Sequence, residues 1–255
     1  MSTWVLLRGL TRETAHWGGF PRALAQALPG ARTVMLDLPG NGRRHADISP
    51  WSVRAMAEAC RDDLRCQGIA PPYHLLAMSL GAMVATEWAR LAPDEVAGCV
   101  LINTSMRPFS RIDQRLRPRN YKRLLSLALF SREPLASETA VWRLTSHQHH
   151  PDPATLAQWV AARAVNPVRR ANAFRQLVAA ARYRAPCQAP VPRTLLLASE
   201  DDGLVHSACS RAIAQAWGCP LWLHPTAGHD LPLDASEWVV HRVCDWLAHS
   251  APAQR

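Results

Sequence analysis

Long apolar runs are absent from this 255-residue chain. No stretch approaches the roughly 18 to 20 consecutive apolar residues that a membrane-spanning helix needs, so the sequence predicts no membrane span. Arg8 and Arg12 interrupt the N-terminus too early for a secretion signal, and we therefore expect a cytoplasmic protein. Internal repeats are also missing.

Cysteine follows no recognisable pattern. The seven cysteines are an odd number, are scattered along the chain and form no Cys-x-x-Cys pair. That spacing argues against a disulfide framework and against a structural zinc site, and we expect most of the cysteines to be small buried hydrophobic residues. His147, His149 and His150 lack acidic or cysteine partners at metal-binding spacing, which favours a solvated loop over a metal site.

Acidic residues are scarce in one segment only. The chain holds 29 Lys and Arg against 20 Asp and Glu, a net charge of +9. Residues 107–184 contain fifteen basic and four acidic residues, or +11, and the remainder contains fourteen and sixteen, or −2. This segment is therefore either a solvated face or a docking surface for an acidic partner. Nucleic acid is the weaker interpretation, because no aromatic-basic motif accompanies the charge.

Short apolar runs alternate with helical patterns, and the 48% hydrophobic content is ample for a sizeable core. This alternation predicts an α/β fold, with a mostly parallel sheet and helices on both faces. The expected strands are 4–7, 33–38, 75–78, 96–103, 194–198 and 220–224. The expected helices are 21–28, 52–67 (with Ser49-Pro50 as its start signal), one directly after residue 79, 207–217 and 236–249.

The alternation stops between residues 107 and 185, where Arg-rich helical stretches are broken by prolines and no strand is evident. We therefore predict a core built from residues 1–106 and 186–255, and a helical insertion at 107–185. We expect Trp142, Trp159 and Phe174 to form a small core of this insertion.

The stretch Ala77-Met78-Ser79-Leu80-Gly81 places a serine between an apolar strand and a helical pattern. Small residues on both sides allow strand and helix to cross closely, which presents the hydroxyl on a tight turn. A helix N-terminus also offers free N–H groups that can bind an oxyanion. The alternative is a serine that caps a buried helix.

Two further loops leave the carboxyl ends of predicted strands. The first contains Asp201 and Asp202, and the second contains His229. A serine nucleophile needs a base, and a histidine base needs a carboxylate that fixes its tautomer. The order Ser, Asp, His along the chain is the order of one serine-hydrolase architecture.

Taken together, these features resemble the α/β-hydrolase family, and the resemblance runs from residue 5 to residue 247. Gly228-His229 resembles the family's catalytic-histidine loop, and residues 36–42 resemble its Asp-x-Pro-Gly-x-Gly turn. The family's Gly-x-x-Asp-x-x-Val loop aligns with residues 199–205 and puts the acid at Asp202, although adjacent acids can exchange roles. The resemblance thus implies a catalytic triad of Ser79, Asp202 and His229, with no metal or cofactor.

The same resemblance implies an oxyanion hole made by the backbone N–H groups of Leu10 and Leu80. Arg8-Gly9 departs from the family's usual His-Gly, so Arg8 either braces its loop or binds an anionic group. Ala77 replaces a glycine of the family's motif, and we expect no loss of activity because alanine is also small. Further candidates for substrate binding are Trp17, Met78, Arg111, Arg115, Arg119 and Arg123.

In α/β-hydrolases a segment at the place of 107–185 forms a cap over the active site. The chain is similar to esterases that act on the methyl ester of pimeloyl-acyl carrier protein, whose cap holds the acidic carrier with arginines. The resemblance implies a serine carboxylesterase or thioesterase that acts on a small ester or thioester through an acyl-enzyme, with an acidic carrier as a candidate partner. Two alternatives stay open, namely a ligand-binding protein with little turnover and a carbon–carbon bond hydrolase.

Overall fold

The protein is built around one six-stranded sheet with the strand order β2-β1-β3-β4-β5-β6, and all five strand pairings are parallel. The structure is a computed structural model that describes residues 2–130, 133–148 and 152–249. Each strand falls within a residue or two of its predicted place. Their bounds are β1 Thr3–Leu7, β2 Arg32–Leu36, β3 Tyr73–Met78, β4 Val96–Ile102, β5 Thr194–Ser199 and β6 Leu221–His224.

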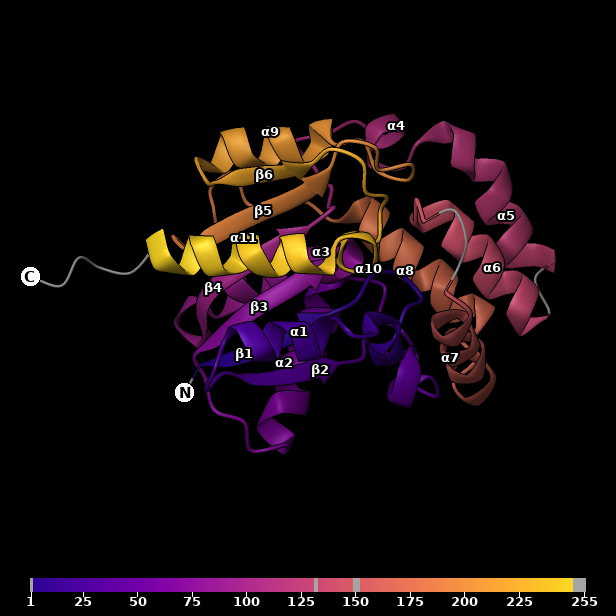
Figure 1. Ribbon diagram of the computed structural model, residues 1–255, viewed down its shortest axis with the longest axis horizontal. Helices are drawn as coiled ribbons and strands as arrows, with labels where there is room; N and C mark the ends of the chain where they lie inside the picture. The colour runs from indigo at the N-terminus through magenta and orange to yellow at the C-terminus, as the bar shows by residue number, and fades with distance from the viewer. Residues whose placement is uncertain (1, 131–132, 149–151, 250–255) are drawn as a thin grey trace, which may run out of the picture.

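Helices cover both faces of the sheet (Figure 1). Alternate strand residues point to opposite faces, so Val5 and Leu7 belong to one hydrophobic cluster while Trp4 and Leu6 belong to another. The first cluster is completed by helices α2 Val53–Cys66, α3 Leu80–Leu91 and α9 Ala208–Trp217. The second is completed by α1 Phe20–Ala27, α10 Leu231–Asp234 and α11 Ser236–His249. This two-sided packing confirms the predicted α/β fold class.

Helix α2 begins differently from the prediction. Its N-cap is Ser52, whose hydroxyl accepts the N–H of Ala55 at 3.2 Å. Ser49 is instead buried in the preceding loop and donates to the carbonyl of Pro39 at 2.6 Å. The Ser49-Pro50 pair therefore shapes the loop and does not start the helix.

In the described part of the chain between β4 and β5, the regular elements are helices, and one isolated β-bridge joins Arg107 to Arg184. They gather at the end of the sheet toward which the strands point (Figure 1). Their bounds are α4 Ile112–Arg115, α5 Tyr121–Phe130, α6 Pro134–Thr145, α7 Pro153–Val165 and α8 Arg170–Arg182. We call α4 to α8 the inserted helices.

The aromatic residues of the inserted helices divide into two groups. Trp142 and Trp159 are buried and lie 5.0 Å apart between ring centroids, as expected of a small core. Phe174 is 59% exposed and packs edge-on against Trp51, with ring centroids 5.9 Å apart. The prediction for Phe174 was therefore wrong, because its face of α8 points outward.

The cysteines are less buried than expected. Cys60, Cys99 and Cys209 are buried, while the other four are partly or fully exposed, and all seven are free thiols. Burial raises the pKa of Cys60 and of Cys99 to about 12, so both stay protonated at neutral pH.

No helix in the described ranges is both long and apolar enough to cross a membrane. Within the same ranges no group of three or more His, Cys, Asp and Glu is placed to hold a metal ion. His147 is exposed and its Nδ1 lies 3.1 Å from the carbonyl of Thr226. His149 and His150 fall outside the described residues.

His74, on β3, lies in an apolar site of the second hydrophobic cluster. Its ring stacks on Trp4 with centroids 4.7 Å apart, and neither ring nitrogen has a hydrogen-bonding partner among the described residues. An unsatisfied buried polar group costs about 1 to 3 kcal/mol. We therefore expect His74→Phe to raise the free energy of unfolding at pH 7 by about that amount, as measured by urea titration.

The same variant has an expected pH dependence. Burial, followed by the charge of Arg193, lowers the pKa of His74 to about 4 from 6.5. Between these values the unfolded chain binds more protons here than the folded chain, so wild-type stability falls as the pH falls from 6.5 toward 4. His74→Phe lacks this loss, and its advantage should grow by about 1 kcal/mol between pH 7 and pH 5, allowing for partial exposure. An unchanged advantage would contradict the assignment.

Candidate active site

Ser79 lies on the turn between β3 and α3 with a left-handed φ of 54°, a conformation that non-glycine residues rarely adopt. Its hydroxyl does not cap the helix, which removes the structural alternative for this serine. The turn is crowded by backbone. A Cβ on Gly81 would lie 2.5 Å from the carbonyl oxygens of Leu7 and Arg8, and a Cβ on Gly9 would lie 3.1 Å from the Ser79 Cβ. Glycine is thus required at 81, as the serine motif suggested.

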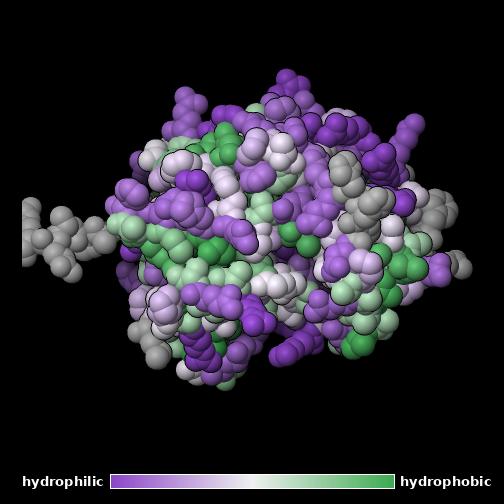
Figure 2. Space-filling view, viewed as in Figure 1, coloured by the Kyte–Doolittle hydropathy of each residue, from purple (hydrophilic) through white to green (hydrophobic). Residues whose placement is uncertain are grey.

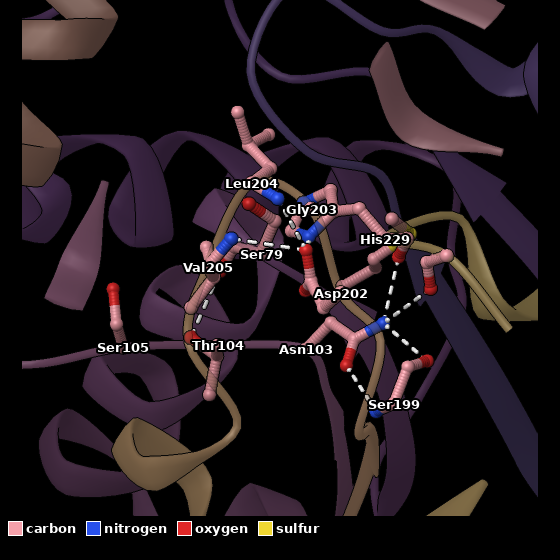
Figure 3. Close-up of polar contacts among 12 residues, drawn as sticks. Ser79, Asn103, Thr104, Ser105, Ser199, Asp202, Gly203, Leu204, Val205 and His229 are labelled. Atoms are coloured by element: carbon pink, nitrogen blue, oxygen red, sulfur yellow. Dashed lines mark hydrogen bonds and ion pairs between the residues drawn. The ribbon is translucent and has the colours of Figure 1, made fainter. Parts of the chain in front are cut away.

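The carboxylate that pairs with His229 is that of Asp202 (Figure 3). Its Oδ2 lies 2.7 Å from His229 Nδ1, and both side chains are buried. Its Oδ1 accepts the N–H groups of Leu204 at 2.7 Å and Val205 at 2.9 Å, which fixes the carboxylate in place. Asp201 points into solvent. Because a carboxylate can only accept, Nδ1 carries the proton and Nε2 is left free to act as a base.

Asn103 is a site residue that the sequence did not reveal. It follows β4, has a φ of 44° and is buried. Its Oδ1 accepts the Ser199 N–H at 2.8 Å, and its Nδ2 donates to the His229 carbonyl at 2.8 Å (Figure 3). It thereby joins the end of β5 to the histidine loop. A polar residue directly after an apolar strand beside the Ser79 strand was the available signal.

Two backbone donors lie on the loops around Ser79. Leu80 is the first residue of α3, and Leu10 follows Arg8-Gly9 after β1. Among the described residues, neither N–H has a hydrogen-bond acceptor. Free N–H groups at these positions can receive a developing negative charge.

Arg8 braces the loop after β1. Its guanidinium donates to both carboxylate oxygens of Asp230, at 3.0 and 2.6 Å, and is buried. It also lies 4.8 Å from the ring centre of Trp17 and 3.6 Å from the sulfur of Met78. Trp17 and Met78 are themselves buried. Both terminal nitrogens of Arg8 are thus engaged by Asp230, the residue directly after His229.

Asp230 stays ionised because of this pair. Burial alone would raise the pKa of Asp230, but the charge and hydrogen bonds of Arg8 outweigh it and lower the pKa below its ordinary value. The pair therefore ties the loop that holds Leu10 to the loop that holds His229.

Removing one member of the pair should be costly, because it leaves the other charge buried alone. We expect Arg8→Ala to lower the free energy of unfolding by about 3 to 5 kcal/mol. The double variant Arg8→Ala/Asp230→Ala should recover part of that loss in the same urea titration. A single variant within about 1 kcal/mol of wild type would show that the pair is not closed in solution.

The four arginine candidates of the inserted segment do not act alike. Arg115 is buried and donates to the carbonyls of Ala180 at 2.6 Å and Ala181 at 3.0 Å, near the end of α8. It therefore caps a helix, and burial lowers its pKa. Arg111, Arg119 and Arg123 are exposed. The surface over α4 and the start of α5 is mostly hydrophilic (Figure 2).

Comparisons with known proteins identify the family to which this chain belongs. Residues 5–236 match the family described as the alpha/beta hydrolase fold. A pimeloyl-[acyl-carrier protein] methyl ester esterase of Aromatoleum aromaticum is 30% identical over 238 residues, which cover 90% of this chain and 83% of that protein. A protein of the same name from Methylococcus capsulatus is 35% identical over 98 residues, which cover 38% of this chain and 35% of that protein.

Solved structures show the same fold. An enol-lactonase from Burkholderia xenovorans superposes with a TM-score of 0.75 at 17% identity, over 97% of this chain and 91% of that one. A carboxylesterase from Bacillus subtilis superposes with a TM-score of 0.73 at 21% identity, over 98% and 84%. The resemblance noted in the sequence is thus confirmed: the chain belongs to the α/β-hydrolase fold family and is a hydrolase of that superfamily.

Proposed function

We propose that this chain is a serine hydrolase that cleaves a carboxylic ester or thioester through an acyl-enzyme. The observation that carries the proposal is the buried Asp202–His229 pair at 2.7 Å, which leaves the other ring nitrogen free as a base. Ser79 supports the proposal as well. It has a positive φ, its side chain is half-buried, and its hydroxyl makes no hydrogen bond that caps α3. The proposed reaction uses these side chains, backbone N–H groups and water.

The mechanism follows from the roles of these groups. His229 Nε2 takes the proton of the Ser79 hydroxyl while its oxygen attacks the carbonyl carbon. The negative charge that develops on the carbonyl oxygen is received by the N–H groups of Leu10 and Leu80. His229 then gives its proton to the leaving alcohol or thiol, and an ester to Ser79 remains. Water activated by His229 hydrolyses this ester, which releases the acid and restores the serine.

The substrate class is proposed from charge and from the relatives. The segment of residues 107–185 carries exposed Arg111, Arg119, Lys122 and Arg123. It meets the acid loop at Gly203, whose carbonyl accepts from Arg119 at 3.3 Å and from Asn120 at 2.7 Å. A relative over most of the chain is named for a methyl ester on an acyl-carrier protein. We assign residues 107–185 as a cap and infer that an anionic substrate or an acidic carrier meets its basic face in the cytoplasm.

The experiment compares two forms of one ester at several salt concentrations. Methyl pimeloyl-acyl carrier protein should be hydrolysed with a higher kcat/KM than free dimethyl pimelate, and the advantage should shrink as salt rises. Lys122→Glu/Arg123→Glu should lower this advantage, whereas Arg22→Glu, an exposed arginine on α1, should leave it unchanged. Hydrolysis of both forms at equal rates would rule out the acidic carrier as a partner but would still support the esterase activity. Hydrolysis of neither ester by a folded protein would count against the proposed function.

A further inference from the structure

Helix α6 and the three residues after it touch two loops that flank Ser79. One is the loop of residues 8–17, which holds Leu10, and the other is the loop of residues 225–234, which holds His229. Both loops belong to the core, whereas α6 belongs to the inserted helices (Figure 1). The contacts that α6 and residues 146–148 make with these two loops include hydrogen bonds and an ion pair.

At the histidine loop, Asp234 and the end of α6 share a dense set of hydrogen bonds. Asp234 Oδ2 accepts the N–H of Gly228 at 2.7 Å and the N–H of His147 at 2.9 Å, and its Oδ1 accepts the Ser146 hydroxyl at 2.5 Å. The Thr145 carbonyl accepts the N–H of Asp230 at 2.7 Å. The residues on both sides of His229 are therefore bonded within this set.

Gly228 is pressed against this end of α6. A Cβ on Gly228 would lie 2.6 Å from the Thr145 carbonyl oxygen and 3.1 Å from the His147 nitrogen. Backbone atoms cannot give way at such distances, so the approach needs glycine. The position of the peptide before His229 is thus set directly by the inserted segment.

At the loop of residues 8–17, the contacts are made by Glu138 of α6, which is buried. It accepts from Arg12 at 2.6 Å and from Arg163 of α7 at 2.9 Å, with its side chain 1% exposed. Burial alone would raise the pKa of Glu138, but the charge of Arg12 and its other partners outweigh it and lower the pKa. Thr11, next after Leu10, donates its N–H to Gln176 of α8 at 2.9 Å.

The ring of contacts closes through Arg8 and Asp230, which join the two loops to each other. We infer that α6 and residues 146–148 act as a strut that sets both loops around Ser79, with Asp234 and Glu138 as positioning residues for hydrolysis. The inference rests on the proposed function. A displacement of about 1 Å in a catalytic group can cost about 100-fold in rate, so the strut affects turnover without touching substrate.

Asp234→Ala tests the contact between the end of α6 and the loop that holds His229. The measured quantity is kcat per active site, with active sites counted by stoichiometric labelling with a fluorophosphonate. We expect this kcat to fall by about 10- to 100-fold with KM changed less than about threefold. Asp152→Ala is the matched control, because Asp152 also accepts an N–H and a hydroxyl, but both belong to Thr155 of α7 and not to either loop. It should keep the wild-type kcat.

Each outcome decides the inference. A merely structural Asp234 would lower the number of titrated sites and leave kcat per site at the wild-type value, which would overturn it. If Asp234→Ala does not fold, Ser146→Ala removes one hydrogen bond to the same carboxylate and should still lower kcat per site severalfold. Glu138→Gln should also lower kcat per site severalfold, because it weakens the contact between α6 and the loop of residues 8–17. A wild type that neither hydrolyses esters nor is labelled would overturn the proposed function and, with it, the strut.

Discussion

Replacing Ser79 with alanine is expected to lower kcat/KM for p-nitrophenyl butyrate by a factor on the order of 10⁵. The hydroxyl is the only group lost, so the fold and the Asp202–His229 pair should stay intact. The residual rate would come from the backbone N–H groups and from substrate binding. Initial rates against enzyme concentration measure the effect.

A second serine provides the control for this change. Ser105 is buried on the loop after β4, and its hydroxyl lies 3.5 Å from the Arg115 carbonyl. Ser105→Ala should keep the wild-type rate within about threefold, because this is a weak hydrogen bond that joins no catalytic group. If Ser79→Ala also kept the wild-type rate, Ser79 would not be the nucleophile.

Asp202→Asn is expected to lower kcat by about 10⁴-fold. An asparagine at 202 can still accept the N–H groups of Leu204 and Val205, so the loop should keep its shape. Its amide would then donate to His229 Nδ1, which moves the ring proton to Nε2 and removes the base.

The neighbouring acid makes the test specific. Asp201 is exposed and chemically identical, so Asp201→Asn should leave kcat unchanged. Equal losses in both variants would mean that the two acids exchange roles in solution. A larger loss at 201 would place the catalytic acid there and contradict the geometry.

Local patterns were sufficient to predict the elements that carry the site. Strand β3 could be predicted because its apolar run stops at a serine flanked by small residues, and Gly81 is small because the carbonyls of Leu7 and Arg8 lie against it. The same is true of β5 and β6, which end at Ser199 and at His224 just before the acid and histidine loops. Burial on both faces, as in β3 and β5, and parallel pairing follow from such continuous apolar runs without long-range information.

The contacts that hold the site could not be predicted in this way, because each joins residues far apart in the chain. Arg8 and Asp230 are 222 positions apart, and Arg12 and Glu138 are 126 apart. Arg115 looks like one more arginine of a basic run, yet its place under the end of α8 makes it a buried cap. Composition marks such residues as charged and says nothing of which partner neutralises them.

The most direct measurement of the central claim is the intact mass of the protein after treatment with a fluorophosphonate, followed by peptide mapping. The Asp202–His229 pair and the half-buried Ser79 predict one adduct per chain, located on Ser79, and no adduct on Ser79→Ala or on wild type pretreated with a slowly deacylating ester. An adduct on another residue, or a preparation that hydrolyses esters while Ser79 stays unlabelled, would contradict the account.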